Sequence, residues 1–89
     1  MKVLFEKSFG RDLKKIKDKR LLKQVRETIE LVETAASLND VPNVKKMQGF
    51  DTYYRIRVGD HRIGIEISEG QAIFVCVLNR KDIYRYFPK

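Results

Sequence analysis

The spacing of apolar residues changes partway along this chain, and that change restricts the fold more than any other feature. Up to Ala36 the apolar side chains recur every three or four residues, as on one side of an α-helix. Residues 37–43 then supply turn formers and a proline, and from residue 44 onward apolar and polar residues alternate with a period of two. A helical half followed by a strand half predicts an α+β fold.

Two helices are predicted in the first half, after a short strand over residues 2–6. Ser8 is the expected N-cap of a short first helix, and Asp18 is the expected N-cap of a longer second helix. The apolar stripe of the second helix, with members three or four residues apart, consists of Leu22, Val25, Ile29, Val32 and Ala36.

Four strands are predicted in the second half, over residues 44–48, 52–58, 61–68 and 71–78. Their connections are so short that neighbouring strands must be antiparallel. The last strand is apolar at almost every position, as expected for a strand covered on both faces. We therefore expect one domain over residues 1–89, with the N-terminal strand and two helices packed on one face of a mostly antiparallel four- to five-stranded sheet, and a short C-terminal helix.

Strand alternation also predicts a cluster of arginines. Successive side chains of a strand point to opposite faces, so Ile56 faces the core when Arg55 and Arg57 face away from it. In the following strand, Ile63 faces the core when Arg62 faces away. Arg55, Arg57 and Arg62 are therefore expected to converge on the face opposite the helices, where permanently charged guanidinium groups favour an anionic partner.

The charge balance favours a polyanion as that partner. The net charge is +7 and the isoelectric point is about 9.7. Residues 1–20 carry eight cationic and three acidic side chains, residues 21–43 carry two and four, and residues 44–89 carry nine and five. The C-terminal excess falls on strands and is interpreted as functional, whereas the run from Lys14 to Arg20 has the pattern of a solvated helix face.

Cysteine usage and hydropathy indicate where the protein works. The one cysteine, Cys76, lies in the apolar run of the last strand, so neither an internal disulfide nor a thiolate metal site is expected. No apolar run approaches the length of a membrane span, and the N-terminus lacks the pattern of a signal peptide. We expect a soluble cytoplasmic protein without membrane association, cofactor or metal.

The sequence Tyr-Arg-Ile-Arg-Val-Gly-Asp-His-Arg-Ile at residues 54–63, followed by Asn-Arg-Lys-Asp-Ile-Tyr-Arg at residues 79–85, resembles the RelE/ParE superfamily of bacterial toxins, and the resemblance spans nearly the whole chain. The RelE branch consists of ribosome-dependent endoribonucleases that cut messenger RNA in the ribosomal A site and are held inactive by an antitoxin. The ParE branch shares the fold but inhibits DNA gyrase. The resemblance favours the nuclease branch, with messenger RNA, the ribosome and a cognate antitoxin as partners, and it allows a heterotetramer with the antitoxin.

The resemblance also assigns roles to individual residues. It implies catalytic roles for Arg55 and Arg57, as supporting hydrogen-bond donors to the phosphate, and for Arg62, as the residue that clamps the phosphate. It further implies catalytic roles for Arg80, as a C-terminal arginine, and for Tyr84, as an aromatic residue that positions a base. Diffuse RNA-binding charge is expected from Lys45, Lys46, Lys81, Arg85 and Lys89.

Two departures from the family pattern leave the chemistry open. Lysine often stands at the positions of Arg55 and Arg57, and histidine or lysine at the position of Asn79, so neither a general base nor a proton donor is evident. Glu66 shares the parity of Arg62 and is either a base or an ion-pair partner of an arginine. His61 shares the parity of Ile63 and is left out of the site. A gyrase inhibitor and an RNA-binding relative without catalysis remain the alternative functions.

Overall fold

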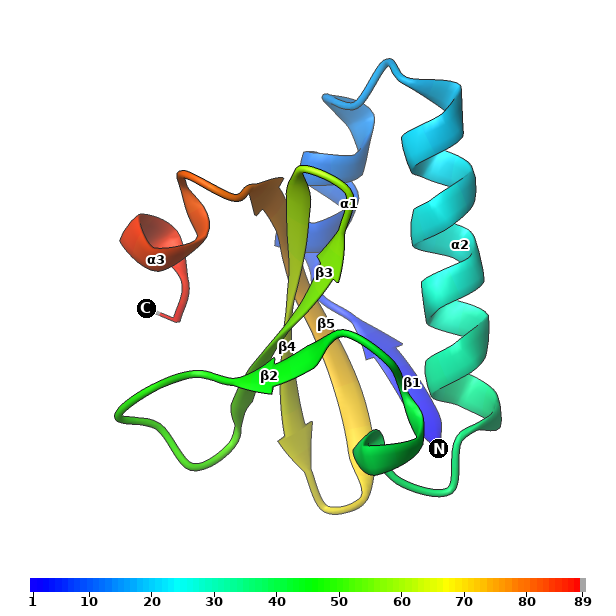
Figure 1. The fold of residues 1–89 in the computed structure, drawn as a ribbon, viewed down its shortest axis with the longest axis vertical. Coiled ribbons are helices and arrows are strands. Elements are labelled where there is room, and N and C mark those ends of the chain that lie inside the picture. Colours follow the sequence, from blue (N-terminus) through cyan, green and yellow to red (C-terminus); the bar gives the residue numbers. More distant parts are fainter. Residues whose placement is uncertain (89) are drawn as a thin grey trace.

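The computed structural model describes residues 1–88, which form a five-stranded sheet with helices on both faces (Figure 1). The elements follow one another along the chain as β1 (Lys2–Phe5), α1 (Lys7–Lys14), α2 (Lys19–Thr34), the 3₁₀ turn η1 (Leu38–Asp40), β2 (Val44–Lys46), β3 (Tyr53–Val58), β4 (His61–Ser68), β5 (Gln71–Asn79) and α3 (Ile83–Tyr86). No helix within these residues is long and apolar enough to cross a membrane.

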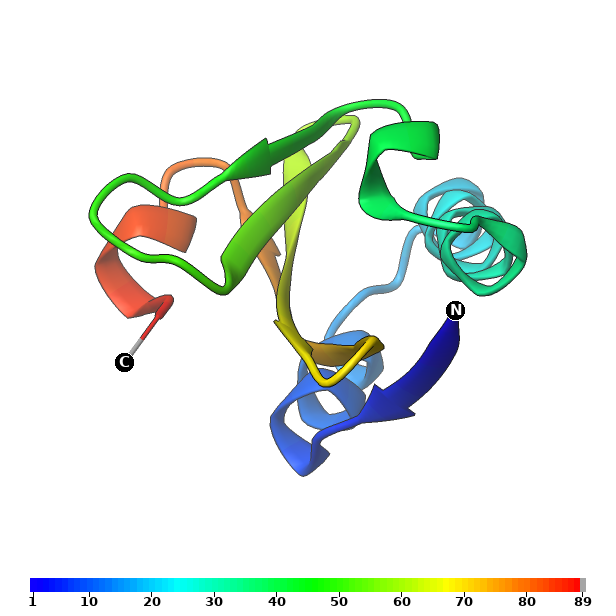
Figure 2. The same cartoon turned by 90° about the horizontal axis from the view of Figure 1, so that it is seen from below.

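The strand order in the sheet is β1-β5-β4-β3-β2. All neighbouring pairs are antiparallel except β1 and β5, which are parallel. The helix α2 covers one face of the sheet and the short helix α3 lies on the other, as the view from below shows (Figure 2). The predicted α+β class, with an N-terminal strand, two helices, a mostly antiparallel sheet and a short C-terminal helix, is confirmed.

Alternation along the strands separates two apolar clusters. On the helix side, Ile56 and Ile63 are directly paired and are buried together with Phe9 of α1 and Val25 of α2. On the α3 side, a smaller cluster holds Met47, Cys76, Ile83 and Phe87. β5 contributes to both clusters, so the prediction of a strand covered on both faces is correct.

A β-bulge lets β5 serve both clusters. Cys76 pairs with Gly64, but the next pair along the strands joins Phe74 to Ile65, so Val75 is an extra residue on β5. Consequently Phe74 and Val77 both belong to the helix-side cluster, although they are three residues apart. The sequence alone predicted an uninterrupted strand here.

The second helix agrees with the sequence at its start and differs at its end. Asp18 is the N-cap, and its carboxylate accepts hydrogen bonds from the backbone N–H groups of Arg20 and Leu21. The helix ends at Thr34, so the predicted stripe member Ala36 lies outside it and is exposed. Leu21 takes the buried position assigned to Leu22, which is only half-buried.

The prediction for Ser8 was wrong. The helix α1 already begins at Lys7, and Ser8 instead donates its hydroxyl hydrogen to the carbonyl oxygen of Val75. One turn later, the buried carboxylate of Asp12 accepts a hydrogen bond of 3.2 Å from the Val77 N–H. The β1 ladder ends at the pair Phe5 and Phe74, so beyond that point α1 side chains satisfy backbone groups of β5 that a longer β1 would have bonded.

Candidate functional site

Arginine side chains from two neighbouring strands meet on the sheet face opposite α2. Arg57 of β3 is directly opposite Arg62 of β4, and Arg55 is opposite Gly64. Directly opposed residues have Cβ atoms about 5 Å apart, so like charges at such positions repel one another. We call the set Arg55, Arg57, Arg62, Arg80 and Tyr84 the arginine face. The first three converge as strand alternation predicted.

The electrostatics of Arg62 reflect this crowding. Burial lowers the pKa of its guanidinium group, and the positive charges of Arg55 and Arg57 lower it further. The charge of Arg80 acts in the same direction, whereas Tyr84 raises the pKa. Arg62 therefore interacts electrostatically with the other four members of the arginine face, and an anion bound beside it would relieve the repulsion from the neighbouring arginines.

Backbone and amide oxygens hold two of the guanidinium groups in place. Arg62 donates from Nη1 to the carbonyl oxygens of Gly59 at 3.0 Å and His61 at 2.9 Å. Arg57 donates from Nη2 to Oδ1 of Asn43 at 3.2 Å, and its backbone N–H donates to the Asn43 carbonyl oxygen at 3.0 Å. Within residues 1–88 no carboxylate forms an ion pair with an arginine of this face. Their charges are oriented but not neutralised.

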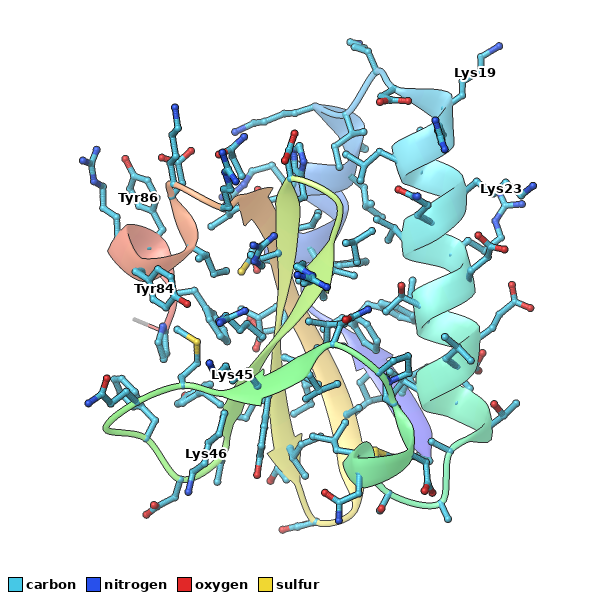
Figure 3. All side chains as sticks on the ribbon, in the orientation of Figure 1. Lys19, Lys23, Lys45, Lys46, Tyr84 and Tyr86 are labelled. Atoms are coloured by element: carbon cyan, nitrogen blue, oxygen red, sulfur yellow. The ribbon has the colours of Figure 1, made fainter. Side chains whose placement is uncertain are left out.

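Two members of the arginine face come from the C-terminal segment. The backbone N–H of Arg80 donates to the Asp60 carbonyl oxygen at 2.8 Å, which ties the end of β5 to the β3–β4 turn. Tyr84, on α3, is 64% exposed, and the guanidinium carbon of Arg55 lies 5.7 Å from the centre of its ring. Figure 3 shows Tyr84 and Tyr86 projecting from α3 beside the sheet. The exposed part of the Tyr84 ring, away from Arg55, is accessible for stacking on a base.

The position of α3 depends on a glycine in β4. A Cβ at Gly64 would lie 2.7 Å from Cys76 Sγ and within 2.9 Å of the Phe87 ring. Phe87 is buried, packs edge-to-face on Tyr53, and together with Ile83 anchors α3 to the sheet. Glycine at position 64 therefore allows the close approach that holds Tyr84 beside Arg55.

Sequence reasoning missed both Asn43 and Gly64. Asn43 has a backbone φ of +66°, a conformation that asparagine tolerates better than most residues. The Pro42-Asn43 pair did mark a turn, but nothing in the sequence linked that turn to Arg57. Gly64 looked like one more small residue within an alternating strand.

The predicted diffuse RNA-binding residues are dispersed. Lys45 is directly opposite Arg55 and so shares its side of the sheet, whereas Lys46 has the other parity and lies 3.7 Å from Asp51. Lys81 is exposed. The Arg85 guanidinium lies 6.0 Å from the centre of the Tyr86 ring. Lys89 lies outside the described residues.

The candidate proton-transfer groups do not join the arginine face. Glu66 is opposite Tyr53 and lies four residues along β4 from Arg62, roughly 13 Å at the usual strand rise. His61, which the sequence analysis left out of the site, pairs with Val58 and Asn79 on the helix side of the sheet. Asn79 uses its side-chain oxygen to accept a hydrogen bond from the Lys81 N–H at 3.0 Å. Within residues 1–88 no three His, Cys, Asp or Glu side chains are grouped so as to hold a metal.

This geometry suits phosphate binding and transition-state stabilisation better than proton transfer. A guanidinium group holds two phosphate oxygens at once, and each donor oriented in advance contributes about 3 kcal/mol to stabilising a developing negative charge. Arginines that remain protonated cannot act as general bases. The arginine face can therefore orient a phosphodiester and neutralise its added charge.

Comparisons with known proteins identify the family of this chain. Residues 3–84 match the family described as ParE toxin of type II toxin-antitoxin system, parDE. The chain is 48% identical over 89 residues to Toxin RelE3 of Methanocaldococcus jannaschii, a match that covers 99% of this chain and 100% of that protein.

Solved structures extend the comparison. The RelB-RelE antitoxin-toxin complex from Methanococcus jannaschii matches with a TM-score of 0.81 and 45% identity, over 96% of this chain and 99% of that chain. The archaeal RelE-RelB complex from Pyrococcus horikoshii OT3 matches with a TM-score of 0.72 and 19% identity, over 89% of this chain and 93% of that chain. The second likeness concerns the fold alone.

Proposed function

This chain belongs to the ParE toxin family of type II toxin–antitoxin systems, and we propose that it is a ribosome-dependent endoribonuclease that cleaves messenger RNA in the ribosomal A site. The observation that carries this proposal is the opposed pair Arg57 and Arg62, with Arg55 beside it and Tyr84 over Arg55. A surface that only binds another protein does not need unpaired guanidinium groups gathered beside an exposed aromatic ring. A single-stranded RNA segment supplies both a phosphate and a base.

The proposed reaction is attack of a ribose 2′-oxygen on the adjacent phosphorus. The new bond from the 2′-oxygen to phosphorus forms as the bond from phosphorus to the 5′-oxygen breaks, which leaves a cyclic phosphate on one fragment and a 5′-hydroxyl group on the other. Arg62 clamps the phosphate, and Arg55 and Arg57 stabilise the added negative charge. Arg80 contributes further positive charge, and Tyr84 stacks on a neighbouring base.

Proton transfer is assigned to groups outside the arginine face. The proton of the 2′-hydroxyl leaves to solvent or to a ribosomal group, and the 5′-oxygen receives a proton from the same sources. Precise placement of the reacting atoms by a large RNA scaffold lowers the barrier enough for weak acids and bases to suffice. Such a reaction would take place in the cytoplasm, where ribosomes translate.

We propose a cognate antitoxin as the regulatory partner. Toxin RelE3 and the RelE chain of the Methanococcus jannaschii complex are both similar to this chain over nearly its whole length, and that complex contains RelB. An antitoxin segment with acidic and apolar residues would neutralise the arginine face and exclude RNA from it. Co-expression with the protein encoded beside its gene should yield a stable complex, a heterotetramer being one arrangement, in which cleavage is blocked.

One observation favours the gyrase alternative, namely that the matched family carries the ParE name. A third function, RNA binding without catalysis, is favoured by Asn79, whose side-chain oxygen is engaged in the turn before α3. Both alternatives keep the fold and dispense with the cleavage step.

The three functions are separated by a reconstituted translation reaction with purified protein, in which messenger RNA ends are mapped, and a gyrase supercoiling assay run beside it. The proposed function predicts cleavage that is confined to ribosome-bound message and is blocked by the antitoxin. Inhibited supercoiling with intact message would identify a gyrase inhibitor. Ribosome binding without cleavage would identify a non-catalytic relative.

A further inference from the structure

A second group of cations lies at the end of the molecule where α1 passes into α2. We call residues 11–23 the basic tip, which carries seven exposed cationic side chains: Arg11, Lys14, Lys15, Lys17, Lys19, Arg20 and Lys23. The proposed reaction uses none of them. Figure 1 places this connection at the same end of the molecule as the β3–β4 turn and the end of β5.

The charge of the basic tip is not neutralised within the tip. Its two acidic residues both have structural tasks, since Asp12 is buried and bonded to β5 and Asp18 caps α2. The one ion pair within residues 11–23, all of which the structure describes, joins Arg11 Nε to Asp12 at 4.0 Å. A net positive charge therefore faces solvent.

Helix stability does not explain all of these cations. Arg11 and Lys14 lie in the last turn of α1, where the helix dipole favours positive charge. Lys19 and Arg20 lie in the first turn of α2, where the dipole disfavours positive charge by about 0.3–1 kcal/mol each, and apart from the N-cap Asp18 no acidic residue accompanies them there. Their placement has a stability cost that points to a function.

The composition of the basic tip indicates the class of partner. No aromatic residue occurs between Gly10 and Gly49, so the tip offers no ring on which an unpaired base could stack. Among the described residues, the exposed large hydrophobic side chains are Leu4, Phe5, Leu31, Phe50, Tyr84 and Tyr86, all outside the tip. A protein partner would need apolar anchors, whereas the phosphate backbone of double-helical RNA needs only cations.

The basic tip lies close enough to the arginine face for one RNA assembly to contact both. Lys17 and Arg20 line a hollow of about 1160 Å³ that Gly59 and Asn79 also line. Gly59 accepts a hydrogen bond from Arg62, and Asn79 precedes Arg80. Asp60 and Asp82 also line this hollow, so phosphates would pass over it rather than enter it.

We infer that the basic tip is a second RNA-binding site, which holds the phosphate backbone of double-helical RNA beside the single-stranded segment at the arginine face. Its place next to a message rests on the proposed function, but its binding of duplex RNA is independent of cleavage. Lys17 and Arg20 line the same hollow as Gly59 and Asp60 of the β3–β4 turn. Lys19 and Lys23 project outward from α2, away from Tyr84 (Figure 3).

The inference is tested by measuring the affinity for a short mixed-sequence RNA duplex as a function of salt concentration. The test variant is Lys17→Gln with Arg20→Gln, and the matched control is Lys2→Gln with Arg26→Gln, which removes the same two charge types from exposed positions elsewhere. The test variant should bind roughly tenfold more weakly at about 0.1 M salt, with a salt slope smaller by about 1 per lost phosphate contact. The control should retain the wild-type slope, and thermal unfolding should show both variants folded.

Equal losses in the test and control variants would overturn the inference, because they would show that only the overall charge matters. An unchanged duplex affinity, with weaker binding of the antitoxin encoded beside the gene, would also overturn it and assign the tip to a protein partner. A wild-type protein that binds duplex through the tip but cleaves no message would contradict the proposed function and leave this inference intact.

Discussion

The arginine face and the basic tip are both cationic, but their charges are held differently. In the arginine face, Arg62 and Arg57 donate hydrogen bonds to fixed oxygens, and Arg62 is half-buried beside other positive charges. In the basic tip the side chains are exposed, and the one ion pair, Arg11 with Asp12, has a separation of 4.0 Å. Oriented charges stabilise one transition state, whereas exposed charges attract any phosphate backbone. This difference predicts that mutations in the arginine face lower message cleavage, whereas mutations in the basic tip lower the affinity for duplex RNA.

The largest effect is expected from Arg62→Ala. Loss of a donor oriented toward the phosphate should lower message cleavage by about a hundredfold or more. The melting temperature should stay equal or rise, because neighbouring arginines and burial already disfavour the charged form of Arg62. Cleavage in the translation reaction and thermal unfolding measure the two effects. Arg26→Ala, an exposed arginine of α2, is the control, and a loss below about fivefold in Arg62→Ala would contradict the assigned role.

Gly64→Ala should impair both folding and cleavage. The added methyl group meets Cys76 and the Phe87 ring, and displacing them should cost about 1–3 kcal/mol and shift α3 with Tyr84. Gly10→Ala is the matched control, since nothing lies within 4 Å of its added methyl group and alanine stabilises a helix by about 0.5–1 kcal/mol. Chemical denaturation and the cleavage assay report both effects. Normal cleavage by a destabilised Gly64→Ala would show that Tyr84 need not be placed by this packing.

Asn43→Gly should have a moderate effect that is specific to activity. Glycine accepts the positive φ at this position but removes the oxygen that receives the Arg57 hydrogen bond. A bond worth about 0.5–1.5 kcal/mol predicts a loss of about two- to tenfold in the cleavage rate. Glu69→Gly, at the other non-glycine residue with positive φ in residues 1–88, should cleave as the wild type does. Equal rates in both variants would mean that Asn43 does not position Arg57.

The smallest effect is expected from His61→Ala. This side chain lies on the helix side of the sheet, opposite the arginine face, so cleavage should change by less than about twofold between about pH 6 and about pH 8. The shape of the pH–rate profile is the informative measurement. A changed profile in this variant would place a histidine-dependent step in the reaction and would contradict the assignment of proton transfer to solvent or the ribosome.

Much of this geometry could be predicted from local sequence patterns. Alternation in β3 and β4, with the short connection at Gly59, was sufficient to place Arg55, Arg57 and Arg62 on one face. The polar residue before the apolar stripe of α2 was sufficient to identify Asp18 as its cap. Such features depend on spacing within one segment or between two adjacent ones.

Features that depend on contacts distant in sequence could not be predicted. Ser8 was read as a cap because a serine before an apolar repeat usually is one, but its partner is the Val75 carbonyl, 67 positions away. The bulge at Val75 and the requirement for glycine at position 64 arise from the packing of β4, β5 and Phe87. Each of these features becomes visible only when the strands are in register.

The most direct test of the two-region account is a titration of isotope-labelled protein, in which arginine side-chain resonances are followed by nuclear magnetic resonance. One ligand is a single-stranded RNA with 2′-O-methyl groups that prevent cleavage, and the other is an RNA duplex. The account predicts that the single strand shifts Arg55, Arg57 and Arg62 together, and that the duplex first shifts Arg11 and Arg20. Shifts of the same arginines by both ligands, or no response of Arg62 to the single strand, would contradict it.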